Sequence, residues 1–183
     1  MTERIATQRL LLAHPSADAG AALLDYRLSN RTHLSPWEPL RTASYYTIEE
    51  VESQLRQLRG EVTAGSAAHW LLTTQDSAEL VGLCSFTNIV RGPFQACHLG
   101  FSLAQQHQGQ GYMAEALPAA IAHVFQTMGL HRIMANYQPC NDRSAALLQR
   151  LGFEREGLAR RYLKIDGYWA DHVLTSLINP HDG

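Results

Sequence analysis

Two glycines one residue apart, Gly109 and Gly111, lie between a strand-like apolar run (residues 96–103) and a helix-like run (residues 114–128). Glycines lack the Cβ atoms that would hold a ligand away from the backbone. The first amides of a helix have no intrahelical acceptors, and the helix dipole adds partial positive charge there. Such a turn can bind phosphate oxygens. A tight turn without a ligand is the alternative interpretation of a lone pair of glycines.

The turn differs from two common nucleotide-binding loops. No Gly-Lys-Ser/Thr follows, as a Walker loop requires, and the third glycine of the Rossmann fingerprint is missing. A second polar block, residues 141–144, precedes an apolar stretch at residues 147–153. Asn141 can cap the helix that begins there, and Ser144 falls in its first turn.

The pattern Gln-x-x-Gly-x-Gly at residues 106–111, together with the block at residues 141–153, resembles the acetyl-CoA motifs of the GNAT superfamily of N-acetyltransferases. Further segments are similar to the RimJ/RimL type of ribosomal-protein alanine N-acetyltransferase, and to RimJ more than to RimL: residues 34–39, 88–92, 131–137, 165–167 and 171–174. The resemblance extends from about Thr7 to Pro180. It implies an α/β (α+β) fold, with a mixed central sheet splayed at the acetyl-CoA site and flanked by helices.

The resemblance also assigns cofactor-binding residues. The loop amides would hold the pyrophosphate of acetyl-CoA: Gln108, Gly109, Gln110, Gly111, Tyr112 and Met113. The pantetheine arm would lie along the preceding strand, on backbone groups of Phe101 and Leu103. Asn141 would contact this arm in addition to capping its helix. Ser144 would bind there and protonate the leaving thiolate, with Tyr137 and Tyr162 as competing phenols.

The general base is less directly indicated. Many relatives carry a glutamate two residues before a Gly-aromatic pair, and this chain has His98 in that register. Imidazole, with a pKa near 6.5, can accept a proton from an ammonium directly or through water. The alternative is a half-buried strand histidine with a backbone partner. RimL-like enzymes use another glutamate at the position where this chain has Leu163, so the RimL mechanism does not apply directly to this chain. Glu38 and Asp171 are alternative acidic candidates for the general base.

Period-two alternation puts His98 and Gly100 on one face of their strand and Phe101 on the other. Since Phe101 is the better core residue, we expect the His98 face to be the site face. Backbone amides of residues 98–101 would polarise the thioester carbonyl. The amine would attack it directly, without an acetyl-enzyme, because no cysteine lies in either motif.

Three residues are expected to shape the acceptor site, because they lie in loops or at strand ends: Trp37, Glu38 and Arg91. For Trp37 the alternative is an aromatic plug at the core edge. His107 could add charge to the phosphate loop or be exposed without a role, and Glu115 could serve the electrostatics of the helix N-terminus.

Composition limits the class of protein. A length of 183 residues suits a single domain spanning residues 1–183. A net charge of −2 argues against general nucleic-acid binding, and we expect no direct DNA binding. Cys84, Cys97 and Cys140 are odd in number and lack a Cys-x-x-Cys spacing, which favours reduced thiols in a cytoplasmic protein. The nine histidines show no ligand spacing, so no metal is expected.

Residues 1–4 contain no apolar run of signal length, and no run of 18 apolar residues occurs, so neither export nor a membrane is expected. We expect a protein substrate and a contact with the ribosome; the sequence leaves the oligomeric state open. The resemblance implies that the protein transfers acetyl from acetyl-CoA to the N-terminal alanine amine of a ribosomal protein. Two alternatives to this function remain. One is a related enzyme that acetylates a polyamine, an antibiotic or a free amino acid. The other is a non-enzymatic acyl-CoA-binding regulator.

The predicted elements follow hydrophobic periodicity and turn signals. Strands are expected at residues 9–12, 69–74, 80–90, 96–103, 132–137, 161–165 and 168–177. Helices are expected after Ser16, after the capping box at residues 47–50 toward Gly60 or slightly beyond, at residues 114–128 with a kink or a looser turn at Pro118, and at residues 142–151. Residues 30–42 are expected to form an ordered loop or short turns, and Asp166-Gly167 a two-residue hairpin.

Overall fold

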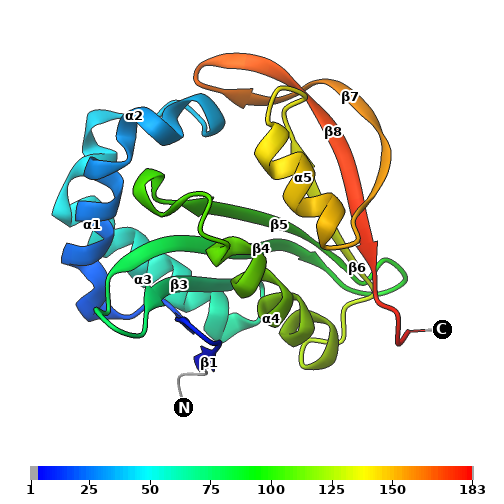
Figure 1. The fold of residues 1–183 in the computed structure, drawn as a ribbon, viewed down its shortest axis with the longest axis horizontal. Helices are drawn as coiled ribbons and strands as arrows, with labels where there is room; N and C mark the ends of the chain where they lie inside the picture. Colours follow the sequence, from blue (N-terminus) through cyan, green and yellow to red (C-terminus); the bar gives the residue numbers. More distant parts are fainter. Residues whose placement is uncertain (1–3, 183) are drawn as a thin grey trace.

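The computed structural model describes residues 4–182; residues 1–3, part of the stretch considered for a signal, lie outside the described residues. Those residues contain one eight-stranded sheet in the order β1-β2-β3-β4-β5-β6-β8-β7 (Figure 1). The strands are β1 Arg4–Ala6, β2 Leu10–Ala13, β3 Ala68–Thr74, β4 Leu80–Val90, β5 Ala96–Leu103, β6 Arg132–Tyr137, β7 Glu154–Ile165 and β8 Tyr168–Ile178. The α-helices are α1 Gly20–Ser29, α2 Arg31–Leu34, α3 Ile48–Ala64, α4 Tyr112–Gln126 and α5 Asp142–Arg150. Short 3₁₀ turns are η1 Ala17–Ala19, η2 Ser35–Trp37, η3 Ala43–Tyr46 and η4 Gln105–His107.

Neighbouring strands run antiparallel except β5 and β6, which run parallel. Their pairing covers three residue pairs and ends at His98 and Met134. Beyond this point β5 continues to Leu103 along β4, while β6 continues to Tyr137 along β8. The strands therefore diverge, and Figure 1 shows β5 running away from β6 and β8. This confirms the predicted mixed sheet with splayed central strands.

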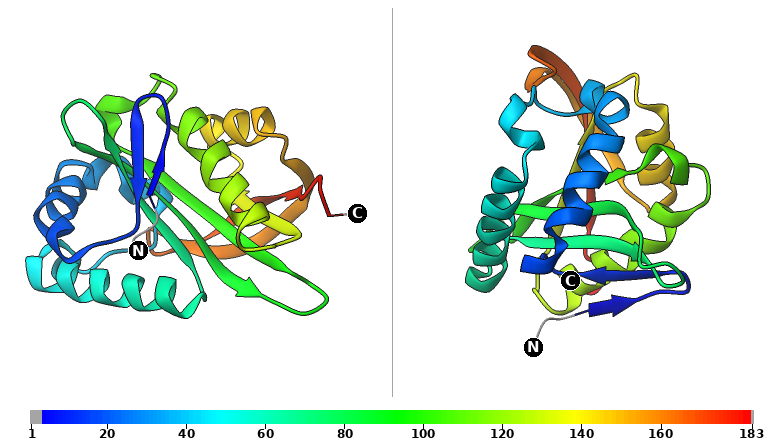
Figure 2. Two further views of the ribbon diagram at one scale, coloured as in Figure 1. Left: turned by 90° about the horizontal axis from the view of Figure 1, so that it is seen from below. Right: turned by 90° about the vertical axis from the view of Figure 1, so that its left-hand side faces the viewer.

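Helices cover both faces of the sheet, as Figure 2 shows. The larger core cluster joins α4 and α5 to the sheet and includes the apolar stripe predicted for α4, with Met113, Leu117 and Val124 buried. A second cluster on the other face joins Leu23 of α1 and Leu55 of α3 to the sheet. Burying a side chain of this size contributes about 1.5–3 kcal/mol, so these clusters hold α4 and α5 on one face and α1 and α3 on the other.

Local signals placed most elements correctly. Strands β4, β5 and β6 have the predicted bounds. Thr47 accepts a hydrogen bond from the N–H of Glu50 at 3.4 Å, as the capping box predicts. Helix α3 continues through Gly60 and ends where Gly65 adopts a left-handed conformation, with φ of 66°. Asp166 and its neighbour both have positive φ, which a two-residue hairpin of this type requires.

Three features were not predicted. Strand β1 and the first part of β7 have charged sequences without clear alternation, and they form because β2 and β8 provide partners. The segment expected as loop or short turns contains α2 as well as η2. The helix at the glycine turn begins at Tyr112, two residues earlier than expected, while its continuation through Pro118 agrees with the expected range. No helix within residues 4–182 is long and apolar enough to cross a membrane.

Candidate active site

A cavity of about 170 Å³ lies where β5 and β6 diverge. Its walls come from β5 (residues 99–101), the end of β6 and the following turn (residues 136–138), the start of α5 (Asn141, Ser144 and Leu148), Trp37 of η2 and His172 of β8. The structure thus brings together four residues that the sequence assigned to the site: Trp37, Phe101, Asn141 and Ser144.

Ser144 and Asn141 lie at the N-terminus of α5. The side-chain oxygen of Asn141 accepts the N–H of Ser144 at 3.1 Å, which confirms its capping role. The Ser144 hydroxyl lines the cavity and has no hydrogen-bond partner among the described residues. It is therefore available to a group bound in the cavity.

The backbone of β5 offers a second binding element. Ala104 donates its N–H to the carbonyl oxygen of Val81 in β4, at 2.8 Å. In an antiparallel pair, residues two apart point the same way, so Ser102 also faces β4. Phe101 and Leu103 then direct their N–H and C=O groups toward the opening beside β6. An extended arm lying there would pair with these groups like an added strand.

The glycine turn leads from β5 into α4. Gly109 and Gly111 have φ of 75° and 81°, a region that glycine enters without steric cost. The N–H groups of residues 109–114 have no acceptor within the described part of the chain. Unpaired amides at a helix N-terminus, next to two left-handed glycines, are an arrangement that binds phosphate. This arrangement supports the predicted role of the loop.

A group of hydrogen bonds that the sequence did not predict holds this loop. Glu115, in the first turn of α4, accepts hydrogen bonds from the Thr7 hydroxyl at 2.6 Å and from Arg9 N and Nε, both at 2.7 Å. Arg9 also donates to the carbonyl oxygen of Gln110 at 2.9 Å and stacks over the Tyr112 ring. Burial acts to raise the pKa of Glu115, but these hydrogen bonds outweigh it and lower the pKa. Glu115 thus ties the β1–β2 turn to the loop.

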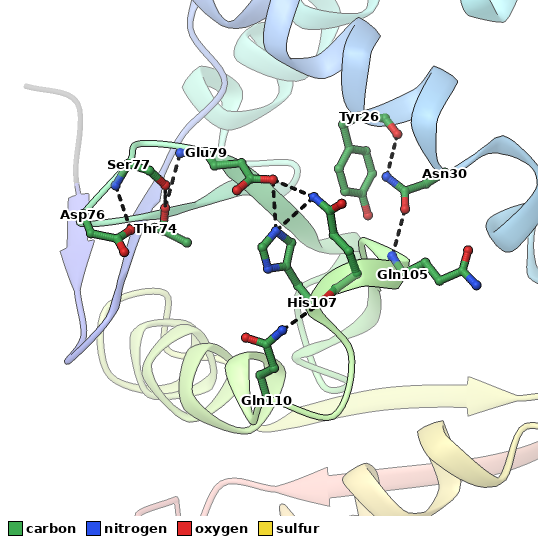
Figure 3. A network of polar contacts seen from close by, with 10 residues as sticks. Tyr26, Asn30, Thr74, Asp76, Ser77, Glu79, Gln105, His107 and Gln110 are labelled. Atoms are coloured by element: carbon green, nitrogen blue, oxygen red, sulfur yellow. Dashed lines mark hydrogen bonds and ion pairs between the residues drawn. The ribbon is translucent and has the colours of Figure 1, made fainter.

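A polar network anchors the other end of the loop (Figure 3). His107 Nε2 lies 3.0 Å from the Glu79 carboxylate, which also accepts from the Gln106 amide at 2.7 Å. The side-chain oxygen of Asn30, the residue after α1, accepts the N–H of Gln105 at 2.8 Å. A cavity of about 500 Å³ beside this network is lined by α1, the β3–β4 turn and η4. Since the polar groups there form hydrogen bonds with one another, we infer that their role is to hold the loop in place.

Gln108 connects the loop to α5 and α2. Its side-chain oxygen accepts a hydrogen bond from Arg143, and its amide lies 2.8 Å from His33 Nε2. Arg143 belongs to the predicted block at residues 141–144. The loop and the start of α5, which are far apart in the sequence, are therefore adjacent across the splay.

Trp37 forms part of the cavity wall and is 38% exposed. Its segment is held at two points. Gln138 Nε2 donates to the carbonyl oxygen of Pro36 at 2.9 Å. The N–H of Asp166 donates to the carbonyl oxygen of Glu38, also at 2.9 Å. The β7–β8 hairpin tip and the β6 turn thus position Trp37 at the mouth of the cavity.

Three residues that were predicted for catalysis or for the acceptor site do not line the cavity. His98 is at the last parallel pair, with Nδ1 buried and without a hydrogen-bond partner, and burial lowers its pKa. Glu38 lies next to Trp37, but its carboxylate pairs with Arg41 at 3.2 Å. Arg91 lies at the opposite end of α4 from the loop and donates to the carbonyl oxygen of Met128 at 2.7 Å. Their predicted roles stay predictions.

The cysteine thiols lie outside the cavity lining. Cys84 and Cys97 are buried, and burial raises the pKa of each thiol to about 12, which makes both poor nucleophiles. Cys140 is exposed. Across residues 4–182, no group of three or more His, Cys, Asp or Glu side chains is placed to hold a metal ion.

Known proteins match both the sequence and this geometry. The family model of the acetyltransferase (GNAT) domain matches residues 9–154. The ribosomal protein uS5-alanine N-acetyltransferase of Escherichia coli (strain K12) is 46% identical over 97% of this chain and 91% of its own. The ribosomal-protein-S5-alanine acetyltransferase from Vibrio fischeri superposes with a TM-score of 0.93 at 36% identity, covering 98% of both chains. Mycobacterium smegmatis RimJ, in complex with CoA-disulfide, gives 0.89 at 29% identity, covering 96% of this chain and 86% of that one.

Proposed function

The chain belongs to the GNAT family of N-acetyltransferases, and on that premise we propose that it transfers the acetyl group of acetyl-CoA to the N-terminal alanine amine of ribosomal protein uS5. The observation that carries the proposal is the cavity at the splay, where unpaired β5 backbone groups meet the free hydroxyl of Ser144. The choice of acceptor rests on the similarity to the Escherichia coli enzyme. Because this acceptor is a ribosomal protein, we place the enzyme in the cytoplasm, in contact with newly made or assembled ribosomal protein.

The cofactor would bind along one continuous path. The amides of residues 109–113 would hold the pyrophosphate, with Gln108 at the junction of the loop and α5. The pantetheine arm would pair with the backbone of Phe101 and Leu103, and Asn141 would contact it. This path brings the thioester into the cavity beside Ser144.

The reaction then needs no acetyl-enzyme. The neutral amine attacks the thioester carbonyl carbon, whose oxygen the backbone amides of residues 98–101 polarise. The C–S bond breaks, and Ser144 donates a proton to the departing thiolate. Trp37 and Glu38 would guide the acceptor chain, since their segment forms the cavity mouth.

The direct test is acetyl-CoA turnover with a peptide that carries the N-terminal sequence of uS5. We expect turnover with this peptide and none when its amine is blocked. A polyamine, an aminoglycoside and free alanine serve as competing acceptors. Faster turnover with one of these amines would make that amine the assigned acceptor. Binding of acetyl-CoA without turnover on any amine would indicate a non-enzymatic binding protein.

A further inference from the structure

The proposed acetyl transfer, on which this inference rests, requires a group that takes a proton from the acceptor ammonium. Three imidazoles lie on alternate strands of the central part of the sheet: His69 of β3, His98 of β5 and His172 of β8. They differ in what their ring nitrogens contact and in whether they reach the cavity.

His172 lines the cavity and is only 4% exposed. The next residue, Val173, pairs with Tyr137, at the point where β6 ends. Leu174, two residues on from His172, pairs with Asn136 of β6, so these three side chains share one face of the sheet. Ser144 reaches the cavity from α5, on the opposite face. A thioester in the cavity would therefore have Ser144 on one side and His172 on the other.

The hydrogen bond of His172 determines which nitrogen is free. Nδ1 lies 3.1 Å from the carbonyl oxygen of Ala170, and a carbonyl oxygen only accepts, so Nδ1 carries the hydrogen. In the neutral ring Nε2 then has a lone pair. Nε2 has no partner among the described residues and is not one of the side-chain nitrogens sealed from solvent. His172, a residue of the cavity wall, thus has an unpaired proton acceptor that solvent can reach.

The other two imidazoles are less suitable. Both nitrogens of His69 are occupied, Nδ1 by the Ser85 hydroxyl and Nε2 by the Glu61 carboxylate, each at 2.8 Å. His98 does not line the cavity, and its buried Nδ1 has no acceptor. Protonating His98 would leave a buried N–H unpaired, which costs about 1–3 kcal/mol. The imidazolium of His172 keeps its bond to Ala170.

We propose that His172, rather than His98, is the general base of the acetyl transfer. An N–H bond of the acceptor ammonium breaks, its proton moves to Nε2, and the freed electron pair forms the bond to the thioester carbon. As the C–S bond breaks, the thiolate takes the hydroxyl proton of Ser144, which regains one from the acylated nitrogen. His172 then releases its proton to water, so the net products are the acetylated amine, CoA and one proton.

Several titratable or charged groups surround His172. The Tyr162 ring of β7 lies 5.7 Å away, and its hydroxyl accepts a 3.4 Å hydrogen bond from Asn136. Tyr137 of β6 faces the same cavity. On β8 itself, Asp171 accepts the N–H of Arg161 at 2.8 Å. Across the cavity, the Glu38 carboxylate is paired with Arg41, and Arg143 of α5 with Gln108. These charges already have partners, which leaves Nε2 as the free acceptor.

The test compares His172→Asn with wild type. The asparagine amide can replace Nδ1 as the donor to Ala170 but has nothing in place of Nε2. We expect the turnover rate at saturating substrates to fall about 100-fold at pH 6.5. At pH 9 the defect should shrink to less than about fivefold, because an N-terminal amine with a pKa of about 7.7–8.0 is then neutral in solution. His98→Asn, the matched control, should show a smaller defect that is the same at both pH values.

A His172→Asn defect of equal size at both pH values, or full activity at pH 6.5, would overturn the proposal. A readout without turnover is the ¹⁵N imidazole spectrum of the wild-type protein. We expect His172 to be protonated at Nδ1, and a ring with hydrogen only on Nε2 would also overturn it. If wild type fails to acetylate the uS5 peptide but accepts another amine, the acceptor assignment fails while the comparison of variants still decides the role of His172.

Discussion

Replacing Gly111 by alanine tests whether the glycine turn holds the cofactor. Gly111 precedes α4 with φ of 81° and ψ of 4°, a left-handed conformation. An added Cβ would lie 3.5 Å from Arg9 Nη2, an ordinary van der Waals contact, so no clash arises. The cost comes from the backbone instead, because a residue with a Cβ is about 1–2 kcal/mol less stable in this conformation.

The chain can respond in two ways, and the two have different readouts. If alanine keeps the positive φ, the free energy of unfolding falls by about 1–2 kcal/mol, which lowers the melting temperature by about 2–8 °C for a domain of this size. If the turn relaxes to a negative φ, the amides of Gly111 and Tyr112 rotate away from the pyrophosphate. Losing one charge-assisted hydrogen bond of about 1.5–3 kcal/mol weakens CoA binding by roughly 10- to 100-fold.

The matched control is Gly60→Ala. Gly60 lies within α3, and a Cβ there would meet nothing within 4 Å. Alanine is favoured over glycine inside a helix by about 0.5–1 kcal/mol, so this variant should be slightly more stable, with unchanged CoA affinity. Calorimetric titration with CoA and thermal melts measure both quantities. A folded Gly111→Ala protein with wild-type CoA affinity and stability would refute the assignment of the turn.

Three further substitutions probe the site and its support. Ser144→Ala should lower the turnover rate about 100-fold with little change in the Michaelis constant for acetyl-CoA, because the hydroxyl acts on the departing thiolate; a change confined to that constant would make Ser144 a cofactor contact. Glu115→Gln should lower stability at pH 7 by about 1–3 kcal/mol through weaker bonds to Thr7 and Arg9. The pKa of Glu115 is lowered in the folded state, so its contribution to stability is present above its unfolded pKa and is lost as the pH falls through the folded pKa. The free energies of unfolding of wild type and variant should therefore converge in acid. Parallel curves of stability against pH would contradict this. Thr47→Ala should cost about 0.5–1 kcal/mol in urea melts, at the low end for a cap because the bond is 3.4 Å long, and leave CoA affinity unchanged.

The parts of the fold that local chemistry determines could be predicted. Apolar runs bounded by turn residues placed β4, β5 and β6, and the capping box placed the start of α3. The block at residues 141–144 predicted both the helix cap and a hydroxyl at the cavity. In each case the residues that form the feature are neighbours in the chain. Strand β1 and the first part of β7 escaped prediction because a partner strand, rather than their own sequence, stabilises them.

The missed site residues depend on contacts between distant parts of the chain. Arg9 and Glu115 are 106 residues apart, and nothing near either residue indicates the other. His172 reaches the cavity only because β8 pairs with β6, which brings it opposite β5 across the splay. Its segment was noted for its resemblance to RimJ, yet a single histidine in a strand has no spacing that indicates a role. The sequence pointed to His98 instead, because the strand register alone cannot show which ring nitrogen is free.

The central claim is that this enzyme acetylates the N-terminal alanine of ribosomal protein uS5. Intact-mass analysis of ribosomal proteins from cells with and without the gene tests it most directly, because every candidate acceptor in the ribosome is observed at once. We predict that uS5 from cells lacking the gene is lighter by one acetyl group, that the other ribosomal proteins keep their masses, and that wild-type enzyme restores the mass of uS5 while the Ser144→Ala variant does so much more slowly. An unchanged mass of uS5, with or without a change in another protein, would contradict the account.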